Sequence, residues 1–177
     1  MDWRTELEAL TQLFPDGGDL IESVESLPHE AMPEPYQSLL CHEHHMTVTM
    51  ERYHHCPVDV HVAFEEYADP LYCREITLTR GGTDQIVQFG LVRFDFSYVT
   101  PAVKADILSK RLPLGRVLIQ HNVLRSIDLK WVLRIEPGPA MRRHLRFDQP
   151  GPVYGRMATI FCNGQPAVEL LEVVGVV

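Results

Sequence analysis

Apolar residues recur at helical spacing near the N-terminus, in residues 3–14, and the run Pro15-Asp-Gly-Gly18 ends the helix that this spacing predicts. Residues 19–26 fit a second, short helical turn. Three prolines between 27 and 38 predict a loop that wraps the body of the protein. We therefore expect residues 1–30 to form a helical N-terminal extension.

The apolar period changes to two at Met46, where apolar residues alternate with threonines, and this predicts a strand over 46–50. A second strand covers 58–64 and ends at Asp69-Pro70. A third covers 71–80 and is followed by a turn at Gly81-Gly82. Residues 85–99 are also rich in β-formers, and their alternation changes phase beside Gly90, which indicates a bulge.

Helices return in the second half of the chain. Pro101 can open a helix that continues to about residue 111, and Pro113-Leu-Gly115 interrupts it before a second short helix over 116–125. A strand follows at 129–135, then a loop rich in proline, glycine and arginine at 137–152, then two final strands. Adjacent strands without helices between them pair antiparallel. The predicted fold class is α+β, with one antiparallel sheet of about six strands and helices packed against it, in a single domain of residues 1–177.

The clearest local signal is Asn163-Gly164 between two β-rich runs, which predicts a tight hairpin because both turn residues must take positive φ. Counting back from the turn places Gly155 opposite Glu172. Glu172 then lies on an apolar face, where a carboxylate loses solvation unless a cation pairs with it. A glycine opposite would leave room for a ligand. The alternative is that this end of the strand reaches solvent and that Glu172 is hydrated there. Glu169 lies on the other face of the strand and is expected at the surface.

The net charge of −8 disfavours nucleic acid and anionic membranes as partners. No apolar run is long enough for a membrane-spanning helix, and the first residues do not have the pattern of a signal peptide. The four cysteines lack paired short spacings, which favours reduced thiols in the cytoplasm over disulfides. We expect a cytoplasmic monomer or homodimer.

Five segments resemble motifs of the chorismate pyruvate-lyase-like family, in the family's order and over roughly residues 30–177. They are Met46-Thr-Val-Thr-Met50, Tyr72-Cys-Arg-Glu-Ile-Thr-Leu78, Leu112-Pro-Leu-Gly-Arg116, Tyr154-Gly-Arg156, and Gly164-Gln-Pro166 followed by Glu172. The resemblance implies a chorismate lyase-like fold. It also implies loss of pyruvate from chorismate to give 4-hydroxybenzoate, a reaction of ubiquinone biosynthesis, with no cofactor and no metal.

The same resemblance implies the site residues. Glu172 is the implied catalytic acid or base, and Arg74, Leu114 and Met32 are the implied substrate-binding residues, with a small carboxylate as ligand. Gly155 joins the expected substrate-binding residues because the predicted hairpin register places it opposite Glu172. Arg74 shares a strand face with apolar neighbours, where a guanidinium needs an anion; the alternative is an ion pair within the core. In the predicted register Arg156 points to the opposite face from Glu172 and is expected to be structural.

Two further functions remain open. Related folds serve as ligand-sensing domains of transcription regulators, so the chain could bind a small aromatic acid without turnover. The histidines between 42 and 61, with Cys41 and Cys56, could instead hold a metal. Their spacing matches no known zinc motif, and surface or loop histidines are the favoured interpretation. Residues 42–55 and Gln120-His-Asn122 depart from the family's pattern, so the resemblance does not fix the identity of the substrate.

Overall fold

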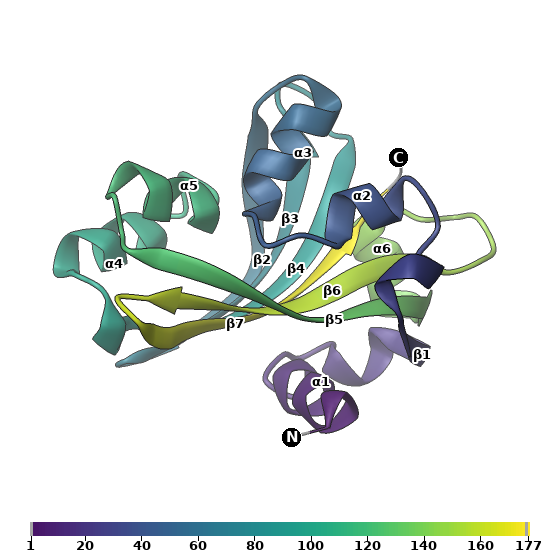
Figure 1. The fold of residues 1–177 in the computed structure, drawn as a ribbon, viewed down its shortest axis with the longest axis horizontal. Helices are drawn as coiled ribbons and strands as arrows, with labels where there is room; N and C mark the ends of the chain where they lie inside the picture. Colours follow the sequence, from purple (N-terminus) through teal and green to yellow (C-terminus); the bar gives the residue numbers. More distant parts are fainter. Residues whose placement is uncertain (1, 176) are drawn as a thin grey trace.

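In the computed structural model, which describes residues 2–175 and 177, the chain forms one seven-stranded antiparallel sheet with helices on both faces (Figure 1). The spatial order is β1-β5-β6-β7-β4-β3-β2. The strands are β1 (Ile21–Leu27), β2 (Val58–Ala68), β3 (Leu71–Arg80), β4 (Ile86–Asp95), β5 (Arg125–Pro137), β6 (Val153–Cys162) and β7 (Gln165–Val174). The predicted α+β class with a single antiparallel sheet is confirmed, and the sheet has one strand more than expected.

The helices divide between the two faces of the sheet. On one face lie α2 (Tyr36–Leu40), α3 (Met46–His54), α4 (Pro101–Leu108) and α5 (Leu114–Gln120), and on the other α1 (Trp3–Thr11) and α6 (Pro139–Leu145). Three short 3-10 turns span Gly17–Asp19, His29–Ala31 and Phe96–Tyr98. Of the helices in the described part of the chain, none combines the length and apolar character needed to cross a bilayer.

Because helices cover both faces, the central strands are buried on both sides. Residues 87–92 of β4 are all buried. This explains the apparent phase change beside Gly90, since side chains of both faces are apolar there. The predicted bulge at Gly90 is wrong. The irregularity between β3 and β4 lies instead at Leu78 and Thr79.

Residues 46–50 form the start of α3, so the predicted strand is wrong. The buried residues of this helix are Met46, Thr47 and Met50. Met46 and Met50 are four positions apart, a spacing that fits one face of a helix and also alternate positions of a strand. A five-residue window could not separate the two. The break before β2 comes at His55, which ends α3 in the left-handed conformation with φ of 54°.

Two other segments differ from the prediction. Residues 21–27 form β1, which pairs with β5 at the sheet edge, although Ile21, Val24 and Leu27 have the three-residue spacing of a helix. Residues 139–145 of the predicted loop form α6, whose first residue is Pro139, a preferred residue at that position. Met141 and Leu145 of α6 are buried against the sheet.

The hairpin of β6 and β7 forms at the predicted turn, with Asn163 and Gly164 at φ values of 53° and 79°. Cys162 pairs with Gln165 as expected. A register shift then follows between Ile160 and Phe161, and beyond it Arg156, not Gly155, lies opposite Glu172. The extra residue in β7 changes which side chains of β6 share a face with Glu172. The predicted pairing of Gly155 with Glu172 is therefore wrong.

Candidate functional site

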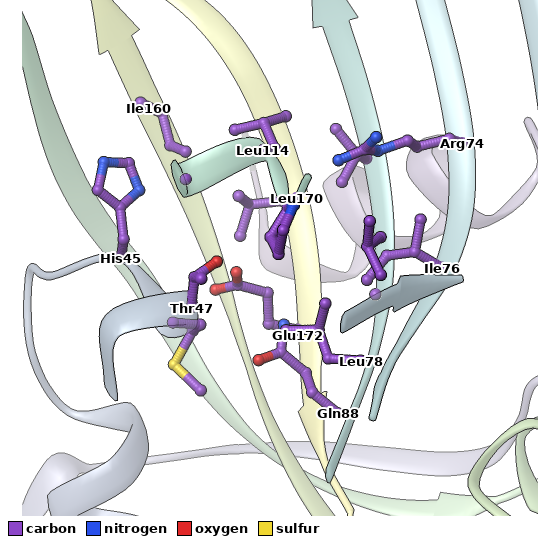
Figure 2. Close-up of a pocket in the computed structure, with 16 residues that line it drawn as sticks. His45, Thr47, Arg74, Ile76, Leu78, Gln88, Leu114, Ile160, Leu170 and Glu172 are labelled. Atoms are coloured by element: carbon purple, nitrogen blue, oxygen red, sulfur yellow. The ribbon is translucent and has the colours of Figure 1, made fainter. Parts of the chain in front are cut away.

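A small cavity lies between the sheet and the segments that carry α3 and α5 (Figure 2). The volume of the cavity is about 40 Å³, which is room for roughly three water molecules. Strands β3, β4, β6 and β7 form most of the floor. The polar lining residues are His45, Thr47, Arg74, Gln88 and Glu172, and apolar side chains such as Ile76, Leu78, Leu114 and Leu170 supply much of the rest. The structure thus brings Arg74, Leu114 and Glu172 to one cavity.

The guanidinium of Arg74 is buried and lacks a carboxylate partner. The residue is 1% exposed, and its Nε and Nη1 atoms have no hydrogen-bond partner among the described residues. Opposite it on β2, Glu65 accepts a hydrogen bond from the Tyr72 hydroxyl at 2.8 Å and pairs with Lys110. Burial lowers the pKa of Arg74, but a guanidinium stays protonated in proteins. The core ion pair considered from the sequence is therefore not formed within the described residues.

Glu172 pairs with Arg156 at the other side of the cavity. Arg156 Nε donates to Glu172 Oε2 at 2.7 Å, and the Glu172 side chain is 13% exposed. The other carboxylate oxygen, Oε1, makes no hydrogen bond with the described residues and is free for a ligand. The expectation that Arg156 points away from Glu172 is wrong, because the register shift turns it to the same face.

Arg156 also holds the histidine-rich segment that borders the cavity in place through hydrogen bonds. Its Nη1 donates to the His42 carbonyl at 2.8 Å and its Nη2 to the His44 carbonyl at 2.9 Å. Every nitrogen of this buried guanidinium therefore has a partner. The sequence analysis did not predict that Arg156 links Glu172 to the histidine-rich segment. The local sign of this role was an arginine next to a glycine on a strand expected to be buried.

Two histidines of this segment are neutral and structural. Burial and the neighbouring Arg156 lower the pKa of His42 to about 4. Its Nε2 lies 2.8 Å from the Leu39 carbonyl, which can only accept, so we assign the proton to Nε2. Burial, with Arg125 and Arg156 nearby, also lowers the pKa of His45 to about 4. Arg125 Nε donates to His45 Nε2 at 2.9 Å, which requires that nitrogen to be unprotonated.

The Pro113-Leu-Gly115 segment closes the cavity from above the sheet. Leu114 begins α5 and lines the cavity, so its place fits the substrate-binding role that the resemblance implies. Gly115 allows close packing, since a Cβ there would lie 3.1 Å from His45 and from the Thr47 hydroxyl oxygen. The absence of a side chain at 115 lets α5 approach the start of α3.

Gly90, rather than Gly155, is the glycine beside Glu172 within the cavity. It pairs with Glu172 on β7 and with Ile76 on β3, and it lines the cavity. Gly155 lies on the face covered by α1 and α6, where a Cβ would be 2.7 Å from the Glu172 backbone oxygen. Met32 is buried in the core beside α2 and α3 and does not line the cavity. The structure therefore separates Gly155 and Met32 from the other predicted site residues.

The histidine-rich stretch does not gather metal ligands. Within residues 2–175 and 177, no group of three His, Cys, Asp or Glu donors includes a residue of 41–61. The four cysteines are free thiols. Glu169, as expected, is a surface residue, and it forms an ion pair with Arg93.

No protein-family model matches this chain, and a search of curated proteins finds no significant match. Solved structures similar to it include a possible transcriptional regulator, YydK, from Bacillus subtilis, with 11% identity and a TM-score of 0.47, over 67% of this chain and 58% of that one. PhnF from Mycobacterium smegmatis has 12% identity and a TM-score of 0.49, over 73% and 62%. The gene product SA0254 from Staphylococcus aureus has 11% identity and a TM-score of 0.47, over 66% and 82%.

This chain thus spans less than two thirds of the length of YydK and of PhnF. At these identities the likeness concerns the path of the chain alone. The chorismate pyruvate-lyase-like family therefore remains a resemblance carried by sequence segments, and one of the five, Met46–Met50, lies in a helix here and not in the predicted strand.

Proposed function

We propose that this protein is a small-molecule binding domain whose cavity takes an organic acid, with the ligand carboxylate against Arg74. The observation that carries this proposal is the buried guanidinium whose Nε and Nη1 have no partner in the described part of the chain. Buried guanidinium nitrogens without an acceptor are costly, and a carboxylate can accept two parallel hydrogen bonds from a guanidinium. A ligand carboxylate would remove that cost.

The charges around the cavity favour a ligand with one carboxylate at this end. Glu172 and Arg156 compensate one another, which leaves Arg74 as the cation without an opposite charge among the lining residues. The walls beside Arg74 are apolar, with Ile76, Val92 and Leu114. Apolar walls next to a cation are chemically complementary to a flat ring that bears a carboxylate, which would enter once the segments that cover the cavity move outward. The free Oε1 of Glu172 can accept a hydrogen bond from a hydroxyl group on the ring.

Calorimetric titration with 4-hydroxybenzoate and with its neutral analogue 4-hydroxybenzamide tests the proposal. We expect the acid to bind about 10- to 150-fold more tightly, because hydrogen bonds to charged groups contribute about 1.5–3 kcal/mol. Arg74→Met should remove this preference. Arg93→Met, which changes an exposed ion pair, is the matched control and should retain it. Equal affinity of the two compounds for the unchanged protein would contradict the proposal.

The second candidate is a lyase that acts on chorismate. It is favoured by Glu172, which shares the cavity with Arg74 and Leu114 and has a free oxygen. In that reaction the bond from the ring carbon to the enolpyruvyl oxygen breaks, a ring proton is lost, and pyruvate and 4-hydroxybenzoate form. A carboxylate within a largely dry cavity is suited to transfer the proton.

Pyruvate release from chorismate, measured in the same protein samples, separates the two candidates. A lyase would release pyruvate and 4-hydroxybenzoate in equal amounts, and Glu172→Gln would abolish the release while Glu169→Gln would not. Tight binding of 4-hydroxybenzoate without pyruvate release would leave the binding domain as the function.

A further inference from the structure

A second group of ionisable side chains lies on the opposite face of the sheet. Glu75 projects from β3, His144 from α6, and Asp16 from the turn that follows α1. His144 Nε2 is 2.9 Å from Glu75 Oε1 and 3.6 Å from Asp16 Oδ2. One donor atom from each residue lies within 4.8 Å of the others. Three segments far apart in the sequence therefore present one nitrogen and two carboxylates to a common point.

The Glu75 carboxylate is buried and incompletely satisfied. The residue is 3% exposed, and its Oε2 atom has no hydrogen-bond partner within residues 2–175 and 177. His144 Nε2 pairs with the other carboxylate oxygen, Oε1, at 2.9 Å, although not in hydrogen-bond geometry. Within the described residues, one buried oxygen of Glu75 thus stays unpaired beside an imidazole nitrogen. Buried polar atoms of this kind are rare in folded proteins, and a bound ion is one explanation for them.

The chemistry of the three donors matches a metal ion better than another ligand. Imidazole nitrogen suits zinc and similar transition metals, and carboxylates also bind them. Zinc lies about 2.0–2.2 Å from such nitrogen and oxygen donors, so two donors around it are separated by roughly 3–4 Å. The separations of 2.9 and 3.6 Å are close to this range. A carboxylate pair with one imidazole also leaves a coordination position open to water beside the half-exposed Asp16.

We propose that Asp16, Glu75 and His144 form a binding site for a divalent transition-metal ion of the zinc type. The ion would join the turn after α1 and the end of α6 to the centre of the sheet. Arg143, whose Nη2 lies 3.5 Å from Asp16 Oδ2, would lose that contact when the carboxylate turns to the metal. The site is separate from the organic-acid cavity, because it lies on the other face of the sheet from Arg74 and Glu172.

Equilibrium dialysis of the full chain against Zn²⁺ at pH 7.5 tests the site. We expect one tightly bound ion per chain and a higher melting temperature with Zn²⁺ present. Glu75→Gln and His144→Gln should each reduce the affinity at least 100-fold. Asp16→Asn, at a more exposed position, should retain the fold and reduce affinity about 10-fold or more. His29→Gln and His55→Gln remove exposed histidines and should leave binding unchanged.

Nitrogen-15 spectra of the histidine side chains identify the ligand independently of variant stability. Zn²⁺ should shift the Nε2 resonance of His144 at one equivalent, before any histidine of residues 42–61 responds. No binding by the unchanged protein, or binding that Asp16→Asn and His144→Gln leave intact, would overturn the proposal. These outcomes do not depend on binding of an organic acid, since none of the substituted residues lines the cavity.

Discussion

Arg74 and Glu75 are neighbours in β3, and the alternation of strand side chains sends them to opposite faces of the sheet. Both are buried, and each has polar atoms without a hydrogen-bond partner among the residues that the structure describes. Arg74 faces a cavity with apolar walls, whereas Glu75 faces His144 and Asp16. One dipeptide therefore serves both candidate sites: its cation is placed to bind an organic anion and its carboxylate to bind a metal cation.

His45 should make the stability of the protein fall in acid. Its pKa is lowered to about 4 by burial and by nearby arginines, whereas the unfolded chain has a value near 6.5. Between these values the unfolded state takes up a proton that the folded state does not, so the free energy of unfolding decreases as the pH falls. The full effect is roughly 3 kcal/mol.

His144 acts in the opposite sense, because the Glu75 carboxylate raises its pKa. The stability from that pair is lost as the pH rises through the raised value.

Urea unfolding between pH 4.5 and 7.5 measures this dependence on His45. The free energy of unfolding should drop more steeply with acid in the unchanged protein than in His45→Gln, whose side chain stays neutral and can still accept from Arg125. His44→Gln alters the exposed neighbouring histidine and should follow the unchanged protein. Parallel curves for His45→Gln and the unchanged protein would show that His45 does not set the acid sensitivity.

At the scale of strands, Gly90 and Gly155 should respond differently to alanine. A Cβ at Gly90 would lie 3.3 Å from Ile76 and point into the cavity beside Glu172. We expect Gly90→Ala to cost under about 1 kcal/mol of stability and to weaken 4-hydroxybenzoate binding about 10-fold. Gly155→Ala should destabilise by about 1–3 kcal/mol, because its Cβ would overlap the Glu172 backbone oxygen.

Thermal unfolding and calorimetric titration of both variants check this contrast. Gly18→Ala is the control, since nothing lies within 4 Å of a Cβ there. Reversed behaviour, with Gly90→Ala destabilised and Gly155→Ala weakened in binding, would show that Gly155 is the glycine at the ligand site.

The elements that could be predicted from the sequence are those whose pattern is set locally. The turn at Asn163-Gly164 has its own conformational signature, and the strands over 58–68 and 71–80 alternate or carry β-formers along their length. The start of α3 and the edge strand β1 could not be assigned, because a few apolar residues fit either period. Pairing partners decide these cases, and they lie far away in the sequence.

The same distinction explains which parts of the site were found. The resemblance named Arg74, Leu114 and Glu172, and the structure places all three at one cavity. One bulge in the hairpin reversed the faces of Arg156 and Gly155, since a shift of one residue turns each side chain of a strand to the other face. His45 and Gln88 enter the cavity only through tertiary packing, for which the sequence has no local signal.

At the scale of the whole molecule, the cavity is too small for a ring-bearing acid as it stands. Its space of about 40 Å³ holds roughly three water molecules. The floor is fixed by the hydrogen-bonded sheet, whereas the cover consists of the starts of α3 and α5 and the segment before α3 (Figure 1). Binding of an aromatic acid therefore requires these covering segments to move outward and close again over the ligand.

Hydrogen–deuterium exchange with and without 4-hydroxybenzoate should detect this movement. Transient opening exposes the amides of residues 41–54 and 114–120, and a bound ligand that holds the cover closed should slow their exchange. The amides of α6, on the far face of the sheet, should be unaffected and serve as the internal reference. Slower exchange confined to α6 would show that the acid binds on the opposite face of the sheet, which contradicts the proposed site. Unchanged exchange throughout, at ligand concentrations that saturate binding by calorimetry, would show that the acid binds without the covering segments.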